Sequence, residues 1–63
     1  MNEANFNMSL RKFLKQVGVS SQQAIEAHVR ESGKDSGHLE ARVVLTIDGT
    51  TFVHEVKGRI DLE

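Results

Sequence analysis

Residues 39–62 read LEARVVLTIDGTTFVHEVKGRIDL and carry the clearest structural signal in the chain. Mostly apolar side chains take every second position up to Ile47, and the same alternation resumes after a short polar gap. Such alternation is typical of strands that bury one face. Asp48-Gly49 lies between the two runs and is a strong hairpin-turn dipeptide. The sequence therefore predicts an antiparallel β-hairpin over about residues 38–62.

Charge pairing between the two strands predicts the register of this hairpin. A two-residue turn at Asp48-Gly49 sets Arg42 opposite Glu55, which is a complementary pair. A four-residue turn keeps the same faces but sets Arg42 against Lys57, and like charges directly opposite one another are unfavourable. A three-residue turn moves Phe52 to the opposite face from the other large apolar residues. We therefore expect the two-residue turn.

The predicted register also leaves one apolar spot on the otherwise polar side of the hairpin. There, Val44 faces Val53 across the two strands. A lone two-stranded ribbon is marginal in water and its edges are open, so this pair is a candidate contact for self-association. Ordinary surface valines are the alternative, because single exposed apolar residues are common.

The N-terminal half predicts two helices. From Phe6 to Val17 the apolar residues follow one helical face, and Asn2 or Asn5 can cap the start. Gly18 supplies a helix stop, after which Ser20 begins a capping box. We expect helices over about residues 3–17 and 21–32, with the second one ending at Ser32-Gly33.

Together these elements predict one small α+β domain spanning residues 1–63. Both helices would pack on the same face of the hairpin, with a sharp helical corner at Gly18-Val19-Ser20. The expected core is Phe13, Leu14, Val17, Ile25, Val29, Leu45, Phe52 and Val56.

Composition limits the classes of protein to which this chain can belong. The 63 residues carry a net charge of -1 and no cysteine, which excludes disulfides and thiolate metal sites. No apolar run is long enough for a membrane span or a signal peptide, so we expect a cytoplasmic protein. Chains below about 70–80 residues usually need a disulfide, a metal or a partner. We therefore expect self-association, with a homodimer as its simplest form.

No residue pattern predicts catalysis. His28, His38 and His54 lack the spacing of a zinc motif, and there is no nucleophile elbow or phosphate-binding glycine loop. His28 and His54 lie on inner faces, and whether they meet is left open. We expect no catalytic, cofactor-binding or metal-binding residue, and hence no enzyme.

The outer face of the first predicted helix is the best candidate for a partner. Met8, Arg11, Lys12 and Lys15 share that face and form a basic strip around a methionine. Such a strip suits an acidic protein partner, although a solvated helix face is the simpler alternative.

A second reading concerns nucleic acid. The corner at residues 18–20 resembles the turn of a helix-turn-helix, which would place Ser21, Gln22 and Gln23 at the start of a recognition helix. Against it, the chain has no third bracing helix, and a net charge of -1 leaves few phosphate contacts. We therefore rank a non-enzymatic interaction module first and a nucleic-acid-binding protein second.

The chain also resembles a known family over its whole length. Residues 1–3, 6–15 and 17–22 carry most of the likeness, and the C-terminal hairpin is similar in pattern. The family consists of short bacterial proteins of about this length and is classed as a domain of unknown function. The resemblance implies a bacterial cytoplasmic protein, and it assigns no catalytic or binding residue.

Overall fold

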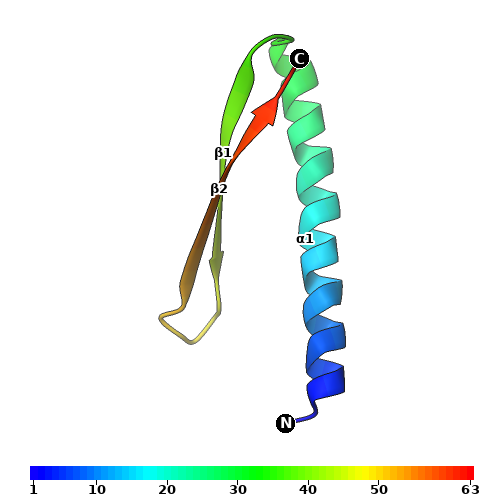
Figure 1. The fold of residues 1–63 in the computed structure, drawn as a ribbon, viewed down its shortest axis with the longest axis vertical. Coiled ribbons are helices and arrows are strands. Elements are labelled where there is room, and N and C mark those ends of the chain that lie inside the picture. Colours follow the sequence, from blue (N-terminus) through cyan, green and yellow to red (C-terminus); the bar gives the residue numbers. More distant parts are fainter.

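The computed structural model describes all residues from 1 to 63. One helix, α1 (Glu3–Ser32), is followed by two antiparallel strands, β1 (His38–Thr46) and β2 (Val53–Asp61). The hairpin turns back beside the C-terminal end of α1, and the two elements diverge toward the hairpin turn (Figure 1). The predicted α+β class with a C-terminal hairpin is therefore confirmed, whereas the prediction of two helices is wrong.

α1 continues without a break through the predicted corner at Gly18. A Cβ placed on Gly18 would meet nothing within 4 Å, and its φ angle is not among the positive ones. The reason is the phase of the apolar residues: Val17, Ala24 and His28 are seven and four positions apart, which keeps them on one face of a continuous helix. A glycine inside a helix costs only about 1 kcal/mol, so Gly18 weakens α1 without ending it.

The two ends of α1 are where the sequence predicted them. The Asn2 side-chain oxygen accepts a hydrogen bond from the Asn5 backbone N–H at 3.0 Å, which is N-capping geometry. At the other end Gly33 has φ 71° and ψ 4°, the left-handed conformation that closes a helix. Of the helix-end signals in this sequence, the two outer ones are used and the inner one at Gly18-Val19-Ser20 is not.

The hairpin register differs by two residues from the predicted one. Arg42 lies opposite Lys57, and Val44 lies opposite Glu55. The Glu55 carboxylate lies 3.8 Å from an Arg42 guanidinium nitrogen and 3.5 Å from the Lys57 ammonium. This diagonal ion pairing neutralises the like-charge contact on which the two-residue prediction depended.

The hairpin turn gives the second reason for this register. The Ile47 carbonyl accepts hydrogen bonds from the Thr50 backbone N–H at 3.2 Å and from the Thr50 hydroxyl at 2.7 Å. The same hydroxyl oxygen accepts the Phe52 N–H at 3.2 Å, and Gly49 takes a φ of 76°. Side-chain bonds from Thr50 thus stabilise a longer turn than Asp48-Gly49 alone would form.

No residue of the chain is buried. Of the predicted core, Val17, Val29 and Leu45 are half-buried. The others are exposed, and Phe13 and Phe52 keep 50% and 48% of their surface in contact with solvent. The predicted inner faces are confirmed, but the expectation that they close into a core within one chain is wrong, because α1 and the hairpin diverge.

The surface area shows how open this arrangement is. The chain exposes 5792 Å², whereas a compact protein of 7.0 kDa exposes about 4,000 Å². Its radius of gyration is 15.3 Å, against about 11 Å for a compact domain of this length. A single chain therefore leaves far more surface in water than a folded domain of its size normally does.

Candidate functional site

The inner faces of α1 and the hairpin line an open apolar groove. It has a volume of about 510 Å³, and eight of the nine residues that line it are hydrophobic. The lining residues are Leu10, Leu14 and Val17 from α1, and Val43, Leu45, Ile47, Phe52, His54 and Val56 from the hairpin. We call this surface the inner groove.

The inner groove exists because the two elements meet only at one end. Near the C-terminal end of α1, half-buried residues of the helix and of the strand ends cluster together: Val29, Leu39, Ala41, Ile60 and Leu62. Toward the turn, the distance between helix and hairpin grows (Figure 1). Apolar side chains that the alternation directs inward therefore face the gap without a partner.

The lining of the inner groove suits contact rather than chemistry. His54 is its only polar residue, and the His54 ring stacks near Phe52 with ring centroids 6.5 Å apart and tilted by 31°. No carboxylate, amine or hydroxyl side chain lines the groove. The groove therefore offers apolar area to an apolar ligand or chain, the kind of surface that marks interaction sites.

The basic strip lies on the opposite face of α1. At 100° per residue, Met8, Lys12 and Lys15 point away from the groove-lining Leu10, Leu14 and Val17, and Arg11 lies at the edge of the strip that is nearer to Leu14. Met8 is 66% exposed. The ion pairs of the chain join other residues, so the three positive charges of the strip have no acidic neighbour of their own.

The structure does not give Ser21, Gln22 and Gln23 the position that the helix-turn-helix reading required. They lie in the middle of α1, where successive side chains point about 100° apart. Ser21 is half-buried, while the Gln22 side-chain amide donates to the Glu26 carboxylate at 3.0 Å. With no turn before them, the three residues do not form the exposed start of a recognition helix, and that geometry is wrong for this chain.

Val44 and Val53 lie on the side of the hairpin away from the inner groove. They are 50% and 66% exposed. The observed register sets Val44 opposite Glu55 and Val53 opposite Thr46, so the prediction that the two valines face each other is wrong. They are diagonal neighbours among charged side chains, and the apolar spot is smaller than expected.

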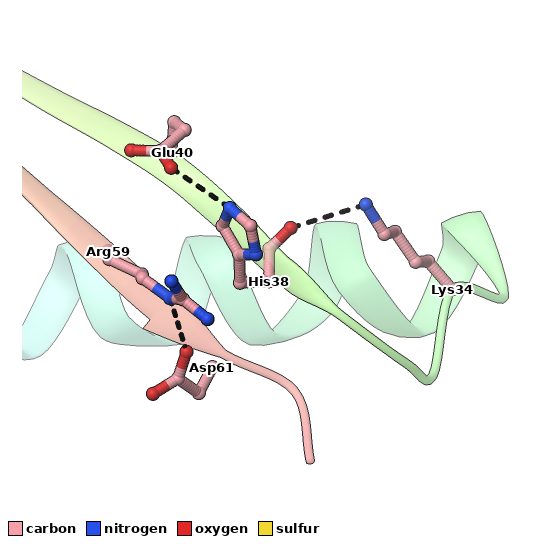
Figure 2. Close-up of polar contacts among 5 residues, drawn as sticks. All are labelled: Lys34, His38, Glu40, Arg59 and Asp61. Atoms are coloured by element: carbon pink, nitrogen blue, oxygen red, sulfur yellow. Dashed lines mark hydrogen bonds and ion pairs between the residues drawn. The ribbon is translucent and has the colours of Figure 1, made fainter.

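A polar cluster lies at the base of the hairpin, and no sequence pattern predicted it. His38 Nε2 lies 3.0 Å from the Glu40 carboxylate, and the Arg59 Nε donates to Asp61 at 2.8 Å (Figure 2). The Lys34 ammonium donates to the His38 carbonyl at 3.3 Å. The alternating charges at the strand ends were its only sequence signal. The Lys34 bond joins the loop after α1 to the start of β1, whereas the other two contacts each lie within one strand.

The remaining titratable groups do not gather into a second site. His28 and His54 line different hollows of the surface, so the structure does not bring them together in one. No group of three or more His, Cys, Asp or Glu side chains is placed to hold a metal ion. No helix is both long enough and apolar enough to span a bilayer.

Residues 1–63 match DUF6494, a family of unknown function. The chain belongs to this family. Searches of curated proteins and of solved structures found no match. The resemblance predicted from the N-terminal sequence is thus confirmed, and DUF6494 membership covers the groove, the basic strip and the polar cluster alike without assigning a role to any of them.

Proposed function

We propose that this DUF6494 protein is a non-enzymatic interaction module that self-associates and uses its basic strip to dock an acidic protein partner. One observation carries the first half of the proposal: a chain of 63 residues that folds into a helix and a hairpin buries none of its residues. Hydrophobic burial is the main favourable term in folding, so a chain without a core needs to bury its apolar faces against something else.

The separate elements support this reasoning. An isolated helix is only marginally stable in water unless an amphipathic face is packed, and an isolated two-stranded hairpin is marginal as well. Within one chain, α1 and the hairpin share only the small cluster at the hairpin base. Association that covers the inner groove would supply the missing core.

The inner groove is a better association surface than the outer valines. The groove gathers eight hydrophobic residues in one place, whereas Val44 and Val53 stand apart among ion-paired charges. Interface cores are depleted of charged residues. We therefore propose that self-association uses the inner groove rather than the Val44 and Val53 side of the hairpin. The open strand edges are the second candidate surface.

The basic strip supports the second half of the proposal. Arg11, Lys12 and Lys15 are unpaired, lie on one face and flank an exposed methionine. Because the strip and the groove lie on opposite faces of α1, a partner on the strip would not compete with association through the groove. Acidic side chains complement the charge of the strip and would steer the encounter.

Molar mass and thermal unfolding test the self-association. Light scattering should give a mass above the 7.0 kDa of one chain, and the mass should fall on dilution. The unfolding temperature, followed by circular dichroism, should rise with protein concentration because association stabilises the folded state by mass action. A 7.0 kDa particle that unfolds cooperatively at a temperature independent of concentration would rule the self-association out.

An NMR titration of the ¹⁵N-labelled protein tests the strip. The probes are a poly-glutamate peptide and a mixed-sequence DNA duplex, each at low and at physiological salt. We expect the peptide to shift the amides of residues 8–15. Shifts caused by the duplex alone, centred on residues 20–23 and lost as salt rises, would instead favour the nucleic-acid reading.

A further inference from the structure

The same chain carries an open groove and an uncovered helix segment of matching chemistry. α1 has 30 residues and is about 45 Å long, whereas nine-residue strands span about 30 Å. The N-terminal end of α1 therefore extends past the hairpin turn (Figure 1). Phe6 lies near this N-terminal end of α1 and is 49% exposed, and Leu10, which lines the groove, is 42% exposed. Both lie on the same face of α1 as Val17.

The excess surface has the size that a homodimer needs. Each chain exposes 5792 Å², about 1,800 Å² more than a compact monomer of its mass. Standard interfaces bury about 800 Å² per partner, and obligate homodimers bury about 2,000–5,000 Å² in total. If each of two copies buried this excess surface against the other, the total buried area would lie within the range of obligate homodimers.

We propose that the inner groove is occupied by α1 of a second copy, with the two helices antiparallel and their N-terminal halves in contact. The pairing is two-fold symmetric, so each α1 is at once a wall of its own groove and the occupant of the partner's groove. This inference rests on the proposed self-association and specifies its geometry. It uses both unpartnered features, the groove and the N-terminal end of α1 around Phe6, in a single interface.

The helix dipoles favour the antiparallel orientation over the parallel one. An antiparallel pair opposes the two dipoles, whereas a parallel pair would align them.

Single spin labels test this geometry directly, because the chain has no cysteine of its own. Gln16→Cys and Ala27→Cys place one label per chain on the same exposed flank of α1, eleven residues apart. In an antiparallel pair centred near Leu14, the two Gln16 labels should lie within about 20 Å of each other. The two Ala27 labels should be about 30 Å further apart than that, since each residue adds a rise of about 1.5 Å on both helices.

Other arrangements give different pairs of distances. A parallel helix pair gives nearly equal short distances at both sites, and pairing through the outer hairpin face places the Gln16 labels about 30 Å or more apart because two sheets separate the helices. Either result overturns the antiparallel pairing while leaving self-association intact. A 7.0 kDa labelled chain with no dipolar signal overturns both. The label variants count only where their mass and helical spectrum match those of the unlabelled protein.

Discussion

Arg42 lies directly opposite Lys57 across the hairpin, and the carboxylate of Glu55 lies within 4 Å of both cations. A like-charge pair at directly opposed positions is unfavourable by itself. Here the diagonal acidic neighbour turns it into a three-residue network. The hairpin thus uses a register that pairwise charge matching rejects, because the network and the Thr50 turn act together.

Removing the charge of Glu55 should weaken the hairpin. We expect Glu55→Gln to lower the free energy of unfolding by about 0.2–1 kcal/mol, since the pairs are exposed and Arg42 is left facing Lys57. The matched control is Asp48→Asn, which removes the same charge from a turn residue outside any ion pair. Equal effects of the two variants, at low and at high salt, would contradict the bridging role of Glu55.

Replacing Gly18 should stabilise the protein. Gly18→Ala adds a Cβ that meets nothing within 4 Å, at a helical position where alanine is favoured by about 0.5–1 kcal/mol. Thermal unfolding followed by circular dichroism measures the effect. Gly33→Ala is the control and should destabilise by about 1–2 kcal/mol, because φ is 71° there. A destabilising Gly18→Ala would indicate that the helix ends or bends at that position after all.

A charge in the inner groove should prevent association. Leu14→Asp places a carboxylate among apolar walls, and we expect the apparent dissociation constant to rise at least about tenfold, measured by light scattering on dilution. Val53→Asp is the control on the opposite face of the hairpin, and its mass should match that of the wild type. The reverse pattern would move the interface to the outer hairpin face.

Charge reversal in the basic strip should weaken binding of an acidic peptide. Lys12→Glu combined with Lys15→Glu should reduce the affinity for poly-glutamate by at least about fivefold, because two attractive contacts become repulsive. Fluorescence anisotropy with a labelled peptide measures the change. Lys34→Glu changes the charge of another exposed lysine, in the loop after α1, and should leave most of the affinity. If the double variant and the Lys34→Glu control both lose affinity in proportion to net charge alone, the strip is not a specific surface.

The sequence predicted the faces of the elements better than their connections. The alternation from Leu39 to Leu62 gave the hairpin and its inner side, and Asn2 and Gly33 gave the ends of the helix. The prediction of a corner at Gly18 was wrong because capping signals were read locally, whereas the phase shared by Val17 and Ala24 extends through them. The helix-stop and capping signals at Gly18-Val19-Ser20 do not end the helix, because a continuous helix keeps a longer apolar face intact.

Of the two candidate surfaces, the basic strip could be predicted from the sequence and the inner groove could not. The face of the basic strip follows from helical spacing alone and needs no tertiary information. The inner groove cannot be predicted from helical spacing, because it depends on the angle between α1 and the hairpin. No local sequence pattern encodes that angle. The expected core residues were correctly assigned to inner faces, yet the expectation of a core assumed that Phe13 and Phe52 would be covered within one chain.

The polar contacts at the hairpin base have a mechanical consequence. The Lys34–His38 bond and the bond from the Leu62 N–H to the Gly37 carbonyl hold the strands to the loop after α1, and no hydrogen bond or ion pair links α1 to the far end of the hairpin. Residues 33–37, with glycines at both ends, are therefore the segment about which the hairpin would rotate relative to α1. The N-terminal end of α1 and the hairpin turn are not bonded to each other. Small rotations at Gly33 or Gly37 would change the opening between Leu10 and Phe52 most, so we expect the width of the groove to adjust when a second chain enters it.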